Sequence, residues 1–297
     1  MKRTAQLRLR GAIHHLGVRT WFMGVVNVTP DSFFDGGKFL EPGQAVERGL
    51  ELAEQGADIL DIGGESSRPG SEPVPAEEEL RRVLPVLRGL RRQTGVFISI
   101  DTTKRAVAEA ALDAGADIIN DISALRFDPS LLALAASRSA AVVLMHMLGT
   151  PKTMQSAPAY GDVVAEVREF LEEREAAVMA AGVERERIIV DPGIGFGKRL
   201  SDNLSLINNL SVFRDLGRPL LVGPSRKSFL GALLDLPAED RLEGTLAASV
   251  LSVVRGAHIL RVHDVLAVSR AVRTAEAVLA EGREAGPPDE SEVRHAG

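Results

Sequence analysis

Cysteine is absent from this chain of 297 residues, which excludes disulfides, thiolate metal sites and cysteine nucleophiles. An excess of basic residues is absent too: the chain has 35 lysines and arginines and 41 acidic residues, for a net charge of −6. Without a basic surface we expect no nucleic-acid partner. The chain has 6 histidines, but they form no cluster of the kind that binds zinc.

Long hydrophobic runs are also missing. No apolar stretch reaches the roughly 18 residues of a membrane span. Residues 1–10, MKRTAQLRLR, lack the apolar core of a secretory signal, so we expect a cytoplasmic protein without a membrane partner. The hydrophobic content of 45% and the charged content of 26% are ordinary for a globular protein.

The segment DPGIGFGKRL, at residues 191–200, has the glycines and the lysine of a phosphate-binding loop, but it matches neither common template. A Walker A loop needs glycine where this chain has Pro192, and serine or threonine where it has Arg199. The dinucleotide-binding fingerprint needs glycine in place of Lys198. The glycines indicate a tight turn, and Asp191 in front of them needs another explanation.

A short pattern recurs along the chain: a helical lead-in, Gly-Ala, a polar residue, an apolar run and a polar end. Its copies are EQGADILDIGG (54–64), DAGADIINDIS (113–123) and VRGAHILRVHD (254–264). This order predicts a helix that ends at a glycine, then a tight turn, then a buried strand. Because the apolar residues do not alternate with polar ones, we expect parallel strands that are covered on both faces.

Apolar runs of this kind alternate with stretches of helical period along most of the chain. The runs are FMGVVNV (22–28), DILDIGG (58–64), VFISIDT (96–102), DIINDIS (117–123), AVVLMHM (141–147), IIVDPGI (188–194), LLVGPSR (220–226) and HILRVHD (258–264). We therefore predict an α/β fold, a (β/α)₈ TIM barrel that forms a single domain over residues 1–280. A doubly wound open sheet is the alternative, but its usual number of strands, about five to seven, fits less well. The polar segment 281–297 is expected to be a disordered C-terminal tail.

Polar side chains stand near the carboxyl end of nearly every predicted strand, where barrels build their active sites. Some of them have a structural alternative. Asp101 could cap the helix that follows it, Asp61 and Asp121 could bind backbone or an arginine, and His146 could be a packed side chain. Polar groups inside apolar runs are costly unless they are paired, so their number indicates a site.

These polar groups form two chemical sets. Asp101, Asn120 and Asp191 offer carboxylates and an amide, and a carboxylate can accept two parallel N–H groups from the edge of a 2-amino-pyrimidinone ring. The second set, suited to phosphate oxygens, comprises Ser67, Arg68, Ser225, Lys227, Arg261 and His263. Asn27 offers a hard oxygen of the kind that gives Mg²⁺ one protein contact. The two sets together indicate a ligand in which a flat heterocycle is joined to phosphate.

Segments from residue 23 to residue 265 form a series that is similar to a known family. They are MGVVNVTPDSFFDGGKF (23–39), DIGGESSRPGS (61–71), SIDTTK (99–104), INDIS (119–123), LMHMLGTPKTMQ (144–155), DPGIGFGK (191–198), GPSRKSFLG (223–231) and RVHDV (261–265). In this order they resemble the sequence blocks of dihydropteroate synthases. A single block would be weak evidence, whereas the whole series in order is highly specific.

The resemblance implies a transferase of folate synthesis that joins 6-hydroxymethyl-7,8-dihydropterin pyrophosphate to p-aminobenzoate. It implies that the pterin is held by Asp101, Asn120, Met145, Asp191, Gly195, Phe196 and Lys227. Pyrophosphate would contact Asn27, Ser67, Arg261 and His263, with Asn27 also at Mg²⁺, the implied cofactor. The p-aminobenzoate site, where sulfonamides compete, would be bordered by Ser67, Arg68, Pro69, Phe196, Lys227 and Ser228. The family also implies a homodimer.

The implied mechanism is a dissociative displacement at the pterin methylene carbon, in which pyrophosphate leaves before the neutral arylamine attacks. Catalytic roles would belong to Arg68, Lys227, Arg261 and His263. Two segments resemble mobile lids, namely TPDSFFDGG (29–37) and SSRPGS (66–71). The chain departs from the commonest family pattern at Ser67, where threonine is more usual, and at Phe34, where serine is common. Both departures bear on drug sensitivity.

Two other functions remain open at this stage. A pterin-binding corrinoid methyltransferase would share the pterin pocket, but it would not need the pyrophosphate residues and would require a cobalamin protein as partner. A non-catalytic pterin-binding homologue would bind the ligand without turnover. The intact lid segments and Lys227 argue against this last function.

Overall fold

A closed barrel of parallel strands forms the centre of the computed structural model, which describes residues 4–29 and 42–281. Its strands are β3 (Trp21–Asn27), β4 (Ile59–Gly63), β5 (Phe97–Asp101), β6 (Ile118–Asp121), β7 (Ala141–Met145), β8 (Ile188–Asp191), β9 (Leu221–Val222) and β10 (Ile259–Val262). They form an 8-stranded sheet in the order β8-β7-β6-β5-β4-β3-β10-β9. A parallel bridge between Val190 and Leu220 joins the two ends of this sheet. The predicted (β/α)₈ barrel is therefore confirmed.

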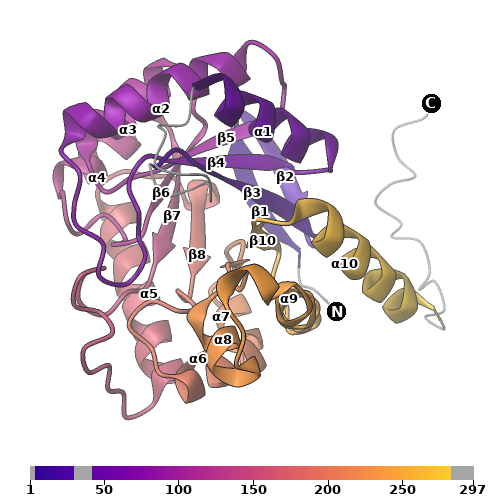
Figure 1. The fold of residues 1–297 in the computed structure, drawn as a ribbon. Helices are drawn as coiled ribbons and strands as arrows, with labels where there is room; N and C mark the ends of the chain where they lie inside the picture. The colour runs from indigo at the N-terminus through magenta and orange to yellow at the C-terminus, as the bar shows by residue number, and fades with distance from the viewer. Residues whose placement is uncertain (1–3, 30–41, 282–297) are drawn as a thin grey trace, which may run out of the picture.

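Helices surround the barrel as an outer layer (Figure 1). They are α1 (Pro42–Glu54), α2 (Ala76–Arg91), α3 (Arg105–Asp113), α4 (Ser130–Arg138), α5 (Val163–Ala180), α6 (Leu200–Asn208), α7 (Ser211–Arg214), α8 (Ser228–Leu234), α9 (Leu242–Val254) and α10 (Val265–Ala280). Short 3₁₀ turns, η1 (Arg185–Arg187) and η2 (Ala238–Asp240), lie between some of them. The helices and the strands bury one large apolar layer between them, which explains why the strand sequences do not alternate.

The glycines of the recurring pattern end helices, as the sequence predicts. Gly56, Gly115 and Gly256 have φ angles of +100°, +103° and +114°, a backbone region that side chains with a Cβ rarely adopt. They follow α1, α3 and α9 and turn the chain into β4, β6 and β10. β9 is shorter than the predicted run 220–226, because Pro224 lacks the N–H that a longer strand would donate.

An N-terminal hairpin, which the sequence analysis does not predict, closes the opposite end of the barrel from the strands' carboxyl ends. It consists of β1 (Ala5–Leu9) and β2 (Ala12–Leu16), paired antiparallel. Leu7, Leu9 and Leu16 are buried and pack against residues inside the barrel, among them Met23 and Ile59. The hairpin therefore belongs to the same core as the barrel.

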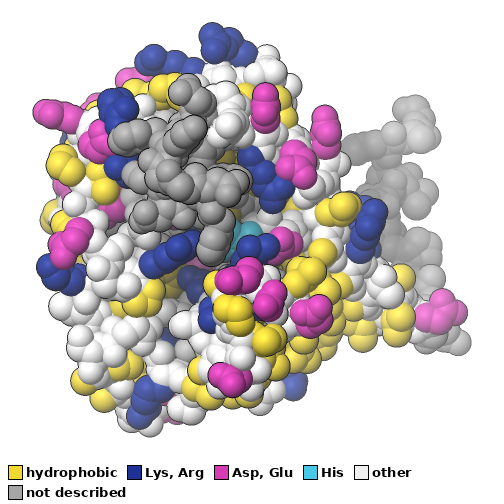
Figure 2. Space-filling view, in the orientation of Figure 1, with side chains coloured by type: hydrophobic (Ala, Val, Ile, Leu, Met, Phe, Trp, Pro, Cys, Tyr) yellow, Lys and Arg dark blue, Asp and Glu magenta, His cyan; other side chains and the backbone are white. Residues whose placement is uncertain are grey.

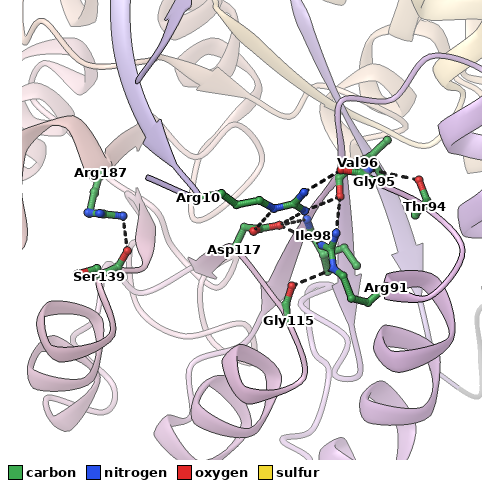
Figure 3. A network of polar contacts seen from close by, with 10 residues as sticks. All are labelled: Arg10, Arg91, Thr94, Gly95, Val96, Ile98, Gly115, Asp117, Ser139 and Arg187. Carbon is green, nitrogen blue, oxygen red and sulfur yellow. Dashed lines mark hydrogen bonds and ion pairs between the residues drawn. The ribbon is translucent and has the colours of Figure 1, made fainter. Parts of the chain in front are cut away.

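A polar network fastens this hairpin to the barrel (Figure 3). Arg10, in the hairpin turn, donates from Nε to Asp117 Oδ1 (2.7 Å) and from Nη1 to the Gly95 carbonyl (2.9 Å). Arg91, at the end of α2, also donates to Asp117, at 3.0 Å. The Ile98 N–H donates to the same carboxylate, at 2.9 Å. One carboxylate thus joins the hairpin, α2 and β5.

The boundaries of the predicted domain, 1–280, and of the predicted tail, 281–297, stay predictions, since residues 282–297 lie outside the described residues. Within residues 4–29 and 42–281, no helix is both long enough and apolar enough to cross a membrane.

Candidate active site

A polar pocket lies where the carboxyl ends of the strands meet, the position at which barrel enzymes build their sites. It is lined by Ser67, Asp101, Asn120, Ile122, Met145, Asp191, Ile194, Phe196, Gly223, Lys227 and Arg261. All of these residues except Ile122, Ile194 and Gly223 are expected from the sequence. The structure therefore brings members of both chemical sets into one pocket.

The other expected residues lie outside this lining. Asn27, at the end of β3, and His263, just after β10, are half-buried. Arg68 and Pro69, in the loop after β4, and Ser228, the first residue of α8, are exposed. Their assignment to ligand sites stays a prediction.

The expected lids are described in part. Of the first lid, 29–37, the residues from 30 onwards lie outside the described residues, and so does Phe34. In the second lid, 66–71, Ser71 Oγ donates to the Ser66 carbonyl (2.6 Å). The Gly70 N–H donates to the carbonyl of Pro151 (3.0 Å). The second lid is thus closed on itself and hydrogen-bonded to the loop that follows β7.

Arg261, on β10, is the centre of the charged network in the pocket. Its Nε donates to Asp61 Oδ2 (2.6 Å) and its Nη2 donates to Asp101 Oδ2 (2.7 Å). Asn120 Nδ2 donates to the same Asp61 oxygen (3.0 Å). Asp101 is therefore an ion-pair partner and not a helix cap: Lys104 occupies the N-cap position of α3. Asp61 binds an arginine, as its structural alternative predicts.

Burial and charge act in opposite directions on this network. Burial raises the pKa of Asp101 to about 7, although Arg261 lowers it. Burial disfavours the charge of Arg261, but Asp61 and Asp101 raise its pKa above the ordinary value. Asp121, one strand position beyond Asn120, accepts the Ser123 N–H (2.6 Å), so it binds backbone. Arg261 is thus a cation that is held between Asp61 and Asp101.

Asp191, at the end of β8, faces the turn 193–197. Its Oδ1 accepts the Gly193 N–H (2.7 Å), and burial raises its pKa to about 6. Gly193 has φ +69°, and a Cβ there would lie 1.9 Å from the His146 carbonyl oxygen. Only glycine allows the turn to pass this close to the end of β7. The turn then places Phe196 in the wall of the pocket.

Lys227 lies across this turn. Its Nζ is 3.9 Å from the centre of the Phe196 ring, a cation–π contact. A Cβ at Gly195 would lie 2.9 Å from Lys227 Cδ, so the turn packs closely against the lysine stem. Burial lowers the pKa of Lys227 to about 7, and Arg261 lowers it further. Gly195 thus does not line the pocket, but it lets the turn pack against the side chain of Lys227, which does.

His263 is held by Ser225, at the end of the β9 segment. Ser225 Oγ accepts the His263 backbone N–H (3.3 Å) and lies 3.0 Å from the ring Nδ1. Burial, with Arg261 second, lowers the pKa of His263 to about 3, so the ring is neutral at pH 7. Either Ser225 Oγ or the ring Nδ1 can be the donor in this contact. Where Ser225 donates, the ring proton is on Nε2 and is free to face a ligand.

Similarity to known proteins assigns this chain to a family. Residues 23–263 match the family model described as pterin binding enzyme. The dihydropteroate synthase of Synechocystis sp. is 46% identical over 263 residues, which cover 88% of this chain and 91% of that protein. The structure of Xanthomonas albilineans dihydropteroate synthase with 4-aminobenzoic acid is 49% identical, with a TM-score of 0.87, and the match covers 94% of this chain and 99% of that one. The Yersinia pestis dihydropteroate synthase in a sulfonamide drug complex is 42% identical, with a TM-score of 0.88, and covers 93% and 99%.

The chain belongs to the dihydropteroate synthase family. This confirms the resemblance and the fold that it implies. The glycine-rich segment 191–198 matches neither nucleotide-binding motif. It contributes Asp191, Ile194 and Phe196 to the pocket of a chain that matches the pterin binding enzyme family.

The donor set of this dihydropteroate synthase family member fits the implied Mg²⁺ in one way only. The ion would take most of its ligands from the bound substrate and few from the protein. In the described part of the chain, no three His, Cys, Asp or Glu side chains are grouped to hold a metal ion. Asn27, at the carboxyl end of β3, offers one amide oxygen. Mg²⁺ commonly takes one or two protein oxygens and completes its shell with phosphate and water, so a single Asn27 contact is compatible with it.

Proposed function

We propose how this pocket carries out the reaction of its family. As a member of the dihydropteroate synthase family, the chain transfers the pterinylmethyl group of 6-hydroxymethyl-7,8-dihydropterin pyrophosphate onto p-aminobenzoate in folate synthesis. The proposal rests on one observation: the ring-binding side chains and the phosphate-binding arginine line the same pocket. A heterocycle bound at Asp191 would thus direct its methylene substituent toward Arg261.

The pterin ring lies between Asp191 and Asn120. Gly193 occupies one lone pair of Asp191 Oδ1, so the carboxylate can still accept two parallel N–H groups from the 2-amino edge. Asn120 gives its Nδ2 hydrogen to Asp61, which leaves its Oδ1 to accept an N–H of the ring. Met145 and Phe196 supply the apolar walls that cover the faces of a flat ring.

The pyrophosphate lies toward Asn27, Ser67, Arg261 and His263. Arg261 keeps its charge throughout, and His263 can donate from Nε2 to a phosphate oxygen. Mg²⁺, held by Asn27 and the substrate, would supply positive charge to the leaving group. Asp101 faces the cation that forms when pyrophosphate leaves. Catalysis is then mainly positioning and charge stabilisation, since a neutral arylamine needs no strong base.

The p-aminobenzoate lies on the outer side of the pterin, where Lys227 and Phe196 meet the second lid. Lys227 lines the pocket and contacts the Phe196 ring. Ser228, its neighbour in the chain, and Arg68, in the second lid, are exposed. Sulfonamides compete for this position, in keeping with the Yersinia pestis complex. Ser67 keeps the hydroxyl of the usual threonine and loses its methyl group.

The experiment that tests the proposal supplies both substrates with Mg²⁺ and follows pyrophosphate and dihydropteroate together. Stoichiometric formation of both supports the mechanism, and EDTA should stop it until Mg²⁺ is restored. Pterin binding without either product would instead support a non-catalytic homologue. Activity that required a cobalamin protein would support a corrinoid methyltransferase.

We further propose that the enzyme is a cytoplasmic homodimer. Large apolar side chains are exposed on α8 and α9, namely Leu233, Leu234, Leu251 and Val254. Figure 2 shows hydrophobic atoms on the part of the surface that these helices form. Exposed apolar side chains on neighbouring helices such as α8 and α9 commonly mark an interface. A second copy of the chain is the partner that the family suggests.

A further inference from the structure

Lys198 is the residue of the glycine-rich segment to which the reaction gives no role. It is 3% exposed and does not line the pocket. Its Nζ donates to the Phe196 carbonyl (3.0 Å) and lies 2.9 Å from His146 Nδ1. The His146 carbonyl, at 3.4 Å, is a third and weaker acceptor. Since an ammonium group has three hydrogens, these acceptors use all of them, and none remains for a ligand phosphate.

These contacts join two parts of the chain that build the pterin site. His146 directly follows β7, and Phe196 lies in the turn after β8. The His146 ring is packed edge-on against Phe170, with 4.8 Å between ring centres and an interplanar angle of 89°. Burial lowers the pKa of His146 to about 2, so the neutral ring can offer the Nδ1 lone pair to Lys198. The ammonium group therefore fastens the turn 193–197 to a rigid strand end.

The charge of Lys198 also acts on Asp191. Burial lowers the pKa of Lys198 to about 7, while Asp191 and Asp202 raise it and Lys227 lowers it. On the other side, Arg126 is the charged group that faces His146. In return, Lys227, Lys198 and Arg261 all favour the ionised form of Asp191. Lys198 thus favours the ionised Asp191 carboxylate from a buried position outside the pocket lining, whereas Lys227 does so from within the lining.

We propose that Lys198 is a positioning residue for pterin binding, a role that rests on the proposed function. Its ammonium group joins His146 to Phe196 and holds the turn 193–197 in the shape that presents Asp191 and Phe196 to the ring. Its charge, buried behind the pocket, keeps Asp191 ionised before the ligand arrives.

The test compares Lys198→Met with the wild-type enzyme, using calorimetric titration with 7,8-dihydropteroate from about pH 5 to about pH 8. Lys198→Met should weaken binding at pH 7 by at least about tenfold, the cost of losing hydrogen bonds to a charged group. The pH below which affinity falls should also move upward, because Asp191 loses a favourable charge. Lys198→Arg, which keeps the charge, should restore the wild-type pH midpoint.

Tyr160→Phe is the matched control. Tyr160 Oη donates to the Gly197 carbonyl (2.7 Å), so its loss loosens the same turn without removing a charge. It should leave the midpoint in place. Wild-type affinity in Lys198→Met, or weaker binding with an unmoved midpoint, would overturn the proposal. If Lys198→Met does not fold, His146→Leu decides in its place, since it removes the ring acceptor, together with the ring contact to Phe170, and keeps Lys198 itself. Wild-type affinity in His146→Leu would overturn the proposal too.

Asp191→Asn, measured in the same series, distinguishes a failure of the proposed pterin site from a failure of the role proposed for Lys198. If Asp191→Asn binds 7,8-dihydropteroate as tightly as the wild type, the proposed pterin site itself is wrong. If Asp191→Asn binds weakly while Lys198→Met binds normally, the site stands and only the role of Lys198 is wrong.

Discussion

At the scale of single residues, Asp191 carries the recognition of the ring. Asp191→Asn keeps the shape of the side chain but replaces one acceptor oxygen with a donor, so we expect pterin affinity to fall by about tenfold or more at pH 7. Wild-type affinity should itself fall as the pH drops through about 6, where the Asp191 carboxylate takes up a proton. Calorimetric titration checks both. Asp113→Asn is the control, because Asp113 pairs with Arg138 at an exposed position outside the pocket lining. An affinity for Asp191→Asn within about a factor of two of the wild type would contradict the assignment.

Arg261 gives a second prediction at the residue scale, this time for stability. Arg261→Gln would leave Asp61 and Asp101 facing each other without a cation, which should cost about 3 kcal/mol of unfolding free energy at pH 7. Burial raises the pKa of Asp101 to about 7 with Arg261 in place, and loss of this cation would raise it further, so the two proteins differ in the ionisation of Asp101 above pH 7 and much less below it. The deficit of the variant should therefore be larger at about pH 9 than at about pH 7.

Urea unfolding at the two pH values measures this deficit. Arg226→Gln serves as the comparison, since Arg226 is bonded to Asp264 at a more exposed position, where the side chains are 37% and 22% exposed. We expect about 0–1 kcal/mol there. Equal losses in the two variants, or a deficit for Arg261→Gln that grows on acidification, would show that Arg261 does not neutralise a buried carboxylate pair.

At the scale of elements, the strands could be predicted because each is a continuous apolar run with a polar end, and because three of them follow a glycine turn. The hairpin β1–β2 could not, because its strands are short and Leu7 and Leu9 become a core only once the barrel gives them a surface to cover. In the site, Asp191 and Asn120 are readable from their place at strand ends. Ile122 and Ile194 line the pocket but carry no chemical signal in the sequence.

Contacts between side chains on different strands of the barrel cannot be predicted from local sequence patterns. Asp101 and Arg261 are separated by 160 residues, and only the closed sheet places them 2.7 Å apart. Asp101 therefore keeps helix capping as an equal alternative until the fold is known. The same holds for Lys198, whose partner His146 lies on the neighbouring strand end. The local sequence pattern identifies the polar residues of the site, and the register of the strands determines which of them are in contact.

The second lid provides a prediction at the element scale. Glu65 accepts the Val74 N–H (2.9 Å) and is bonded to Lys104, so it closes the loop that carries Ser67 and Arg68. Glu65→Gln removes one of the two carboxylates that bind Lys104, the other being Glu79, and it should raise the KM for p-aminobenzoate several-fold while changing kcat less. Steady-state kinetics with each substrate varied measures this split. Glu72→Gln is the control on the same loop, because Glu72 and Lys152 form an exposed pair. An unchanged KM in Glu65→Gln would mean that the loop does not need this closure.

At the scale of the whole molecule, the apolar face of α8 and α9 predicts the assembly. If two copies bury this face, the protein should sediment with about twice the chain mass of 31.8 kDa. Leu251 and Val254 are 52% and 48% exposed, and a glutamate at each would place two charges in the interface. The Leu251→Glu/Val254→Glu variant should therefore sediment as a monomer, whereas Val18→Glu, which changes an 87% exposed residue in the turn after β2, should remain a dimer. Because the residues lining the pocket come from one chain, the monomer should still bind pterin. A double variant that stays dimeric would place the interface elsewhere.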